Sequence, residues 1–464
     1  MRHFWPFGEA SVRARLENAT SAKVRFGSFH EKYFPFGCVA ERVILQGSET
    51  NHANISIERL IITSNPFAML RHQVSQLRAE GVQIAIDKLD KSLLHSKSSQ
   101  TTIDNFVVND AVLKLGDGSS QPFRLTLQSL RLQNLGGNGL VRFSAVFQNP
   151  MPAGVVRMSG SVGPWNRSDT SATAVSGQYS LENADLAVFH SIGGKVSSTG
   201  NFAGTFKALE VQGSTDSPAF ELTDTHHQLP VRTTFGIRVD VVSGDMDIQS
   251  VKADFGRDQL EAQGTVARGP DHKRVALIDI NCRRGRIEDT FYPFIHSPKS
   301  PLTGDVVFRM HVRIPAGGER FVKRVEFNSD FAIANAKFTN PQTEFRLSKV
   351  SDQKQSDPAP PAADIDGRVV LRAGTARFSA LSVKDPGASA QLHGTYNLID
   401  NRVDMHGQLT TTANLAKTTS GIKAVFARVL QPLVKKRHHE KIIPVKITGS
   451  FHHPSFGLDM SSRM

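Results

Sequence analysis

Apolar residues recur at every second position along most of the chain. Clear alternating runs lie at 55–57, 82–86, 123–127, 141–147, 235–239, 306–314 and 445–447. Gly, Asn, Asp, Ser or Pro bounds each run, and many alternate positions are polar. A period of two predicts strands with one apolar and one polar face. Such one-sided strands favour an antiparallel sheet over a doubly wound parallel one.

The first alternating pair lies close to the start of the chain. Residues 23–45 read KVRFGSFHEKYFPFGCVAERVIL, with Val24 and Phe26 in one run and Val39, Val43 and Leu45 in the next. The Phe-Pro and Gly residues between the two runs predict a turn rather than a site. We expect this stretch to form the first hairpin of the sheet.

Short helices are predicted between the strands. Residues 9–19 have helical spacing, Asn65 is an N-cap for NPFAMLRH, and Asn183 begins a helix that ends at Gly193. A strongly amphipathic helix is predicted over 420–436, with Ile422, Phe426 and Leu430 on its apolar side and the basic run KKRHHEK after it. This helix either packs on the sheet, or contacts an anionic membrane surface or covers a hydrophobic groove.

Weak internal repetition supports a fold that grows by addition of similar units. SGDMDIQSVKADFGRDQLEAQGTV (243–266) matches AGTARFSALSVKDPGASAQLHGTY (373–396) in layout, with Gly264 aligned to Gly394. Residues 185–206 and 286–308 both predict a short helix, a loop, a Gly and a strand. The expected organisation is an N-terminal module at 1–100, a central repetitive region at 101–350, a flexible Pro-rich loop at 351–363 and a C-terminal β region at 364–464.

Composition narrows the classes of function. The 464 residues carry a formal net charge of +12, which suits acidic partners such as nucleic acid, anionic lipid headgroups or an acidic protein face, or a soluble protein with a basic balance. Phe occurs 29 times against 4 Tyr and 2 Trp, which indicates an apolar core or an apolar binding surface. The only cysteines, Cys38 and Cys282, are either two buried thiols, which we favour, or one long-range disulfide.

Motifs for catalysis or metal binding are absent from the sequence. It has no P-loop, nucleophile elbow, HExxH or dinucleotide fingerprint, and we nominate no catalytic, metal-binding or cofactor-binding residue. Adjacent His pairs at 226–227, 438–439 and 452–453 point to opposite faces of a strand, so we interpret them as surface residues. Nucleic-acid binding rests on net charge alone, and we expect no nucleic-acid partner.

Several segments together resemble the AsmA-like family of bacterial envelope proteins. At the N-terminus the likeness rests on Ala19-Thr20, Val24, Phe34-Pro35, Val43, Ile57-Glu58-Arg59-Leu60, Glu80-Gly81 and Ile84. It continues in VVRMSGSVGPWN, in YSLENADLAVFHSIGGKVSSTGNFAGTFKALEVQG, in GTYNLIDNRVDMHGQL and in IPVKITGSFHHPSFGLDM. The order of these segments is more specific than any one of them.

This resemblance implies a mainly β, elongated, taco-like antiparallel groove built from repeated hairpins with a few short helices. It implies a non-enzymatic periplasmic protein for phospholipid transfer or outer-membrane assembly that holds acyl chains in the groove, with phospholipid or another lipid, the inner membrane and envelope proteins as partners. The alternative is a structural β-protein that scaffolds envelope partners. The family's N-terminal membrane helix and a signal peptide are not visible in this sequence, so we expect a natural start upstream of Met1 and an inner-membrane anchor there. The residues proposed to face lipid or membrane are Phe123, Leu125, Leu127, Val141, Phe143, Phe147, Val306, Phe308, Ile422, Phe426 and Leu430.

Overall fold

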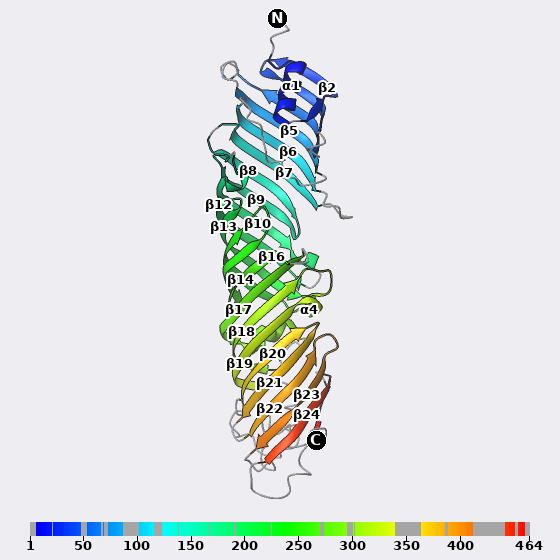
Figure 1. Cartoon of the computed structure of the whole chain (residues 1–464), viewed down its shortest axis with the longest axis vertical. Helices are drawn as coiled ribbons and strands as arrows, with labels where there is room; N and C mark the ends of the chain where they lie inside the picture. The colour runs from blue at the N-terminus through cyan, green and yellow to red at the C-terminus, as the bar shows by residue number, and fades with distance from the viewer. Residues whose placement is uncertain are drawn as a thin grey trace. The chain divides into compact units, whose positions relative to one another are not determined.

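The structure, a computed structural model, is mainly β (Figure 1). It describes residues 6–20, 22–47, 53–65, 68, 73–86, 102–115, 123–137, 139–166, 168–189, 192–223, 225–269, 273–294, 300, 302–338, 363–385, 388–411, 441–450 and 453–459. Antiparallel strands dominate these residues, and the helices among them are few and short. The predicted fold class is therefore confirmed.

Twelve strands make up the N-terminal half of the described sheet. They are β1 (Lys23–Arg25), β2 (Ser28–Tyr33), β3 (Phe36–Gln46), β4 (Ala53–Thr63), β5 (Gln73–Ile86), β6 (Thr102–Leu115), β7 (Phe123–Leu135), β8 (Val141–Pro150), β9 (Ala153–Val162), β10 (Ala174–Asp185), β11 (Ile192–Gly193) and β12 (Lys195–Thr205). The helical segments are α1 (Glu9–Thr20), η3 (Thr170–Ala172) and η4 (Leu186–Phe189).

The remaining strands continue the same pattern of hairpins. They are β13 (Ala208–Leu222), β14 (Leu229–Val239), β15 (Met246–Phe255), β16 (Asp258–Arg268), β17 (Arg274–Arg286), β18 (Leu302–Pro315), β19 (Glu326–Phe338), β20 (Ala363–Arg372), β21 (Thr375–Asp385), β22 (Ala388–Asn397), β23 (Arg402–Thr411), β24 (Lys441–Ser450) and β25 (His453–Leu458). Three short helices accompany them: α3 (Ile287–Phe291), η5 (Tyr292–Phe294) and α4 (Phe321–Arg324).

The chain forms two compact units. Unit 1 comprises Met1–Val188, Lys195–Thr215 and Ile237–Gly244, and unit 2 comprises Phe189–Gly194, Asp216–Gly236 and Asp245–Met464. In unit 1, β3 pairs with β1 and β2 on one side and with β4 on the other, and the ladder continues in chain order through β10 to β12. In unit 2, β15 to β25 pair in chain order.

One pair in unit 1 breaks the antiparallel rule. β5 and β6 run parallel, with Gln73 opposite Thr102 and Ile86 opposite Leu115. A parallel pair requires a crossover connection, and residues 87–101 supply a chain segment between the two strands. Period-two alternation is the same in parallel and antiparallel strands, so the pattern alone did not reveal this pair.

At one level of unit 1, the pairing skips one residue in each of four neighbouring strands without a change of register. The pairing skips Arg42 in β3, Glu58 in β4, Gly81 in β5 and Asp110 in β6. Arg42, Gly81 and Asp110 have positive φ values of 51°, 63° and 54°. The buried positions change phase at the skipped residue, from Cys38 and Ala40 to Val43 and Leu45 in β3. Because the skipped residues are aligned across the strands, the apolar residues stay on one common face.

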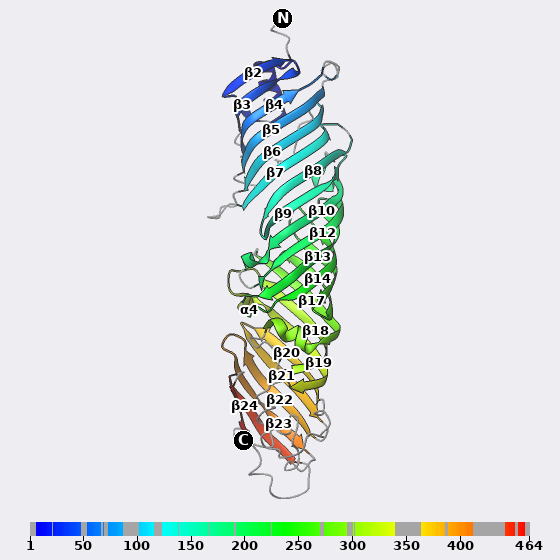
Figure 2. The same cartoon turned by 180° about the vertical axis from the view of Figure 1, so that it is seen from behind.

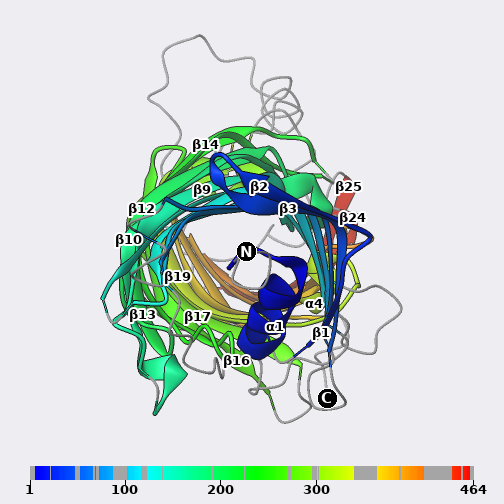
Figure 3. The ribbon, with the colours of Figure 1, turned by 90° about the horizontal axis from the view of Figure 1, so that it is seen from above.

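Helix α1 covers the N-terminal part of that apolar face. Figure 3 shows α1 on the concave side of the strands of unit 1. Its Val12 is 4% exposed and packs in one cluster with Val43 of β3, Leu60 of β4 and Val82 of β5. The helix predicted over 9–19 is therefore confirmed, and its apolar side chains remove the first strands of the sheet from solvent.

Unit 2 has a closely packed apolar face of its own. Val306, Ile333, Ile365, Val383, Ala390 and Leu409 lie opposite one another on six successive strands, β18 to β23. Ile287 of α3 joins this cluster, and Phe321 and Val325 at α4 join a second cluster on β18 to β21. Figure 2 shows the strands β18 to β24 of this unit from behind.

Of two other predicted helices, one begins later than expected and one is only partly within the described residues. Asn183 does not begin a helix, because it lies in β10 with a φ of 52°. The helical turn η4 starts three residues later, and Asp185 accepts a hydrogen bond from the Ala187 N–H at 2.9 Å. Asn65 accepts a hydrogen bond from the Ala68 N–H at 2.7 Å, as expected of an N-cap, but the rest of its predicted helix lies outside the described residues.

The segment 23–45, predicted to form one hairpin of two strands, forms three strands instead. β2 and β3 form a hairpin whose turn is Phe34–Pro35, and β1 pairs separately with the far end of β3. The turn expected from Phe-Pro is confirmed. Residues 351–362 and the predicted helix at 420–436 lie outside the described residues, and Ala363, expected in the loop, begins β20 and is 3% exposed.

The predicted repeat of 243–266 and 373–396 has a structural counterpart. Hairpins β15–β16 and β21–β22 both carry a bulge at the same place, between Ile248 and Val251 in the first and between Phe378 and Leu381 in the second. Ile248 pairs with Gly264 and Phe378 pairs with Gly394, so the aligned glycines occupy equivalent positions. The matching layout of 243–266 and 373–396 is confirmed as a pair of similar hairpins.

Candidate functional site

The candidate site is the apolar face of β7 to β12 in unit 1. Pairing places three rows of side chains on this face, each crossing the strands in order. The rows are Leu127, Phe147, Val156, Leu181 and Ser198; Leu130, Ala145, Met158, Tyr179 and Gly200; and Leu132, Phe143, Gly160, Gly177 and Phe202. Leu127 and Leu130 also pack in the cluster under α1, so the face continues from the covered part of the sheet.

Aromatic rings lie over glycines on this face. Phe143 and Phe202 stack with their ring centroids 6.5 Å apart, and the glycines of the two intervening strands lie between them. A Cβ added at Gly177 would be 2.7 Å from Cζ of Phe202, and one added at Gly200 would be 2.7 Å from Cε1 of Tyr179. The glycines therefore leave the space that the rings fill, and the result is a continuous apolar floor.

This floor remains partly open. Val141, Phe143 and Phe147 are partly exposed, whereas Ala145 and Phe202 are 8% and 7% exposed. None of the three buried apolar clusters among the described residues includes Phe143, Ala145 or Phe202. An apolar sheet face that protein atoms cover incompletely is suited to contact with an apolar partner.

The structure places the predicted lipid-facing residues in three groups. Leu125, Leu127, Val141, Phe143 and Phe147 lie together on β7 and β8 of unit 1, with Leu127 opposite Phe147. Two more lie on the apolar face of unit 2: Val306, which is 2% exposed, and Phe308, which is partly buried. The remaining four have no described side chain: Phe123, at the first position of β7, and Ile422, Phe426 and Leu430.

Several residues of the floor were not predicted from the sequence. Met158, Tyr179 and Phe202 are apolar or aromatic, but glycines at 160, 177 and 200 interrupt the alternation around them. The signal was present as a period of two that passes through Gly, as in Val156, Met158, Gly160 and Val162. Counting glycine as an apolar-face residue would have found these strands.

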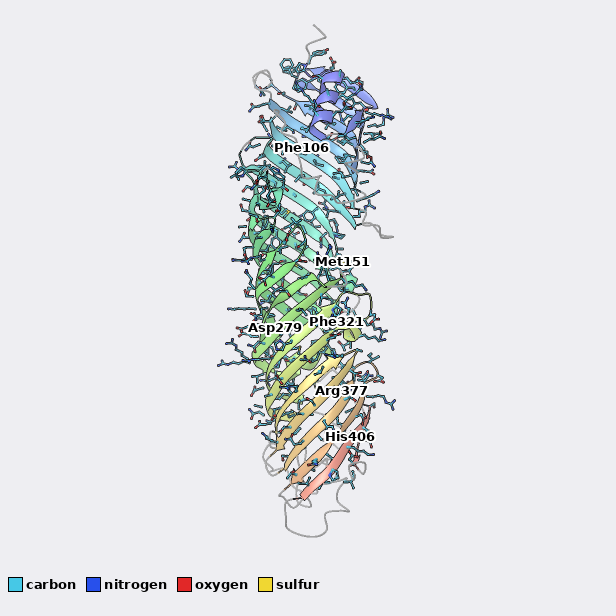
Figure 4. The ribbon with its side chains drawn as sticks, in the orientation of Figure 1. Phe106, Met151, Asp279, Phe321, Arg377 and His406 are labelled. Atoms are coloured by element: carbon cyan, nitrogen blue, oxygen red, sulfur yellow. The ribbon has the colours of Figure 1, made fainter. Side chains whose placement is uncertain are left out.

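Charged residues lie on the opposite, polar side of the strands and are often paired across strands. Arg157 contacts Glu182 at 2.7 Å in unit 1, and Arg368 contacts Asp330 at 2.7 Å in unit 2. Asp279 of β17, labelled in Figure 4, lies 2.5 Å from Nδ1 of His311 on the neighbouring strand. Exposed pairs of this kind add little stability, but they make the two faces chemically different.

A buried carboxylate fixes helix α3 in unit 2. Asp258 is 1% exposed and accepts hydrogen bonds from the Arg286 N–H and the Thr290 hydroxyl, both at 2.7 Å. Burial raises the pKa of Asp258, and these two hydrogen bonds oppose the rise. Asp258 thereby holds the two ends of α3, which carries Ile287 into the apolar cluster.

Both cysteines are free, buried thiols, as favoured from the sequence. Burial raises the pKa of Cys38 to about 12, with a smaller contribution from the charge of Glu31. Burial, together with the charge of Asp258, raises the pKa of Cys282 to about 11. A thiol that holds its proton this strongly is a poor nucleophile at neutral pH, so both act as packing residues.

The histidine pair at 226–227 differs from the expectation of two surface residues. His226 is exposed, but the ring of His227 stacks on Tyr292 with centroids 4.4 Å apart, and its Nδ1 lies 2.9 Å from the Tyr292 carbonyl oxygen. His227 is therefore partly buried beneath a neighbouring ring rather than fully exposed. The pairs at 438–439 and 452–453 have no described side chains.

The described part of the chain contains no helix that is both long and apolar enough to cross a bilayer. Nor does it bring together three or more His, Cys, Asp or Glu side chains in an arrangement that could hold a metal ion. Comparison with known proteins found no matching family model, no matching curated protein and no matching solved structure. The resemblance to the AsmA-like family therefore stays a prediction.

Proposed function

We propose that this protein is a non-enzymatic lipid-transfer or envelope-assembly protein that holds acyl chains against the apolar face of its sheet. The observation that carries the proposal is the partly open floor on β7 to β12, where Phe143 and Phe147 keep part of their surface exposed. The predicted resemblance to AsmA-like envelope proteins supplies the lipid class, phospholipid, and the periplasmic location.

The chemistry of the floor supports an acyl chain as ligand. Phe143, Phe147, Val156 and Met158 present carbon and sulfur atoms on one face, in rows that run from strand to strand. Burial of apolar surface against such a face is favourable by about 25 cal/mol per Å², and an acyl chain needs no hydrogen-bond partner. A row that crosses several strands offers the extended contact that a long hydrocarbon chain requires.

A second candidate function, a structural protein that scaffolds envelope partners, is favoured by unit 2. Its apolar face is closely packed by its own side chains, with Leu409 and Val445 each 1% exposed. A face that is already buried has little apolar surface left for a ligand. This alternative requires the floor of unit 1 to bind protein rather than lipid.

Lipid extraction and native mass spectrometry of purified protein test the proposal. We expect the wild-type chain to retain phospholipid and the Phe143→Glu variant to lose most of it, because a carboxylate in the floor makes acyl burial unfavourable. Ser144→Glu is the matched control, since Ser144 is the next residue of β8 and is exposed on the polar face. It should retain lipid as the wild type does.

The outcomes separate the two candidates. Lipid loss in Phe143→Glu with retention in Ser144→Glu supports lipid binding on the floor. Lipid-free wild-type protein after purification in mild conditions, or equal lipid content in both variants, contradicts it. Circular dichroism of the two variants establishes that each is folded before their lipid contents are compared.

A further inference from the structure

The tip of the β2–β3 hairpin is the most exposed aromatic feature among the described residues. Phe34 is 94% exposed and Tyr33 is 58% exposed, and Pro35 completes the turn between the strands. Figure 2 shows β2 and β3 at the N-terminal end of unit 1. A single exposed apolar residue is ordinary, but a nearly fully exposed Phe beside an exposed Tyr forms a small exposed aromatic patch on this turn.

The hairpin presents this tip on a fixed base. Six residue pairs join the strands, from Ser28 opposite Glu41 to Tyr33 opposite Phe36. Phe29 and Phe36 pack against the apolar cluster under α1, so the base of the hairpin is anchored in the core of unit 1. Little conformational entropy therefore remains to be lost when the tip contacts a partner.

Size and charge decide what kind of partner fits the tip. A stable protein–protein interface takes roughly 20–30 residues a side, far more than one turn offers. Aromatic side chains favour the headgroup region of a bilayer, where an apolar ring and a polar hydroxyl are both satisfied. The chain carries a formal net charge of +12, which suits anionic headgroups.

We propose that the tip Tyr33–Phe34–Pro35 is a membrane-contact element that inserts into the headgroup region of an anionic bilayer. Phe34 supplies the inserted ring, and Lys32, two residues before it on β2, is the basic residue nearest to it in the hairpin. This inference rests on the hairpin alone and goes beyond the proposed binding of acyl chains to the floor of β7 to β12.

Vesicle flotation tests the inference. The probe is vesicles of phosphatidylcholine and phosphatidylglycerol, compared with phosphatidylcholine alone. Phe34→Ser should weaken binding to the anionic vesicles about 10-fold, which corresponds to losing the burial of one ring. Phe34→Trp should retain binding. Phe294→Ser is the matched control, since Phe294 is also an exposed Phe, at 51%, in unit 2.

Each outcome supports or overturns the inference. Loss in Phe34→Ser, with binding kept in Phe34→Trp and Phe294→Ser, supports insertion of the tip. Unchanged binding of Phe34→Ser, a wild-type chain that floats with neither kind of vesicle, or a change in oligomeric state instead of vesicle binding overturns it. Phospholipid that co-purifies with Phe34→Ser as with the wild type shows that acyl binding on the floor is a separate property, so each proposal fails or survives independently.

Discussion

Truncation of Phe202 is the sharpest test of how the apolar floor is packed. The ring is 7% exposed, stacks on Phe143 with centroids 6.5 Å apart and fills the space left by Gly177. Burial of a Phe side chain contributes about 1.5–3 kcal/mol, and an aromatic pair adds about 1 kcal/mol. Because the floor is partly open, water can fill the space that the removed ring leaves. The free-energy cost of an empty cavity therefore adds little to the loss. We therefore expect Phe202→Ala to lower the free energy of unfolding of unit 1 by about 3 kcal/mol.

Urea denaturation followed by tryptophan fluorescence measures this change in unit 1. Both tryptophans of the chain, Trp5 and Trp165, belong to that unit. Asn201→Ala is the control, because Asn201 is an exposed neighbour on the same strand and should change stability by less than about 0.5 kcal/mol. If Phe202→Ala lowers the free energy of unfolding by less than about 1 kcal/mol, the packing described above is refuted, because removal of a buried ring packed over glycines costs more than that. A double-mutant cycle with Phe143→Ala should give a coupling energy of about 0.5–1.5 kcal/mol.

Three further predictions concern titratable groups. Burial raises the pKa of Asp258, so the carboxyl group binds a proton more tightly in the native than in the unfolded state. The free energy of unfolding therefore falls as pH rises from about 4 through the native pKa. Asp258→Asn should make this pH dependence of the melting temperature less steep. The hydrogen bond to Asp459 raises the pKa of His406, so the stabilisation that this bond gives is present below about pH 6.5 and is lost as pH rises through the native pKa. The amide protection factors of β24 and β25, which correct for the base-catalysed intrinsic rate, should fall over that range, and less so in His406→Gln. With pKa values of about 12 and about 11, the thiols of Cys38 and Cys282 should resist iodoacetamide in native protein at mildly alkaline pH and react in urea.

Each of these three has a contrary result. A pH slope for Asp258→Asn equal to that of the wild type would show that another group is responsible for it. Protection factors in β25 that fall equally with pH in the wild type and in His406→Gln would remove the role given to His406. Rapid alkylation of either cysteine in native protein would mean that its thiol is not enclosed by the core.

Much of the sheet was predictable because alternation is a direct consequence of strand geometry. The seven alternating runs, from 55–57 to 445–447, all lie within strands. The skipped positions at Arg42, Gly81 and Asp110 were not predicted, since each changes the phase of the pattern by one residue and resembles noise in a single strand. These positions became evident only where pairing aligned them across neighbouring strands.

The candidate site was predictable only in part. Leu127, Phe143 and Phe147 stand out because they are large and alternate, and they do share the floor. Phe202 comes from a strand more than fifty residues along the chain, and only the pairing through β9 and β10 brings it to Phe143. Apolar alternation also cannot distinguish a closed face, such as the one around Leu409, from an open one.

Photo-crosslinking with a phospholipid that carries a reactive group on its acyl chain tests the central claim most directly. Peptide mapping by mass spectrometry should place the crosslinks on alternate residues of β8: on Phe143 and Phe147, and not on their exposed neighbours Ser144 and Gln148. A period of two in the labelled positions is the result predicted for acyl chains that lie on one face of the sheet. Labelling spread equally over both faces, or labelling absent from β8, would contradict it.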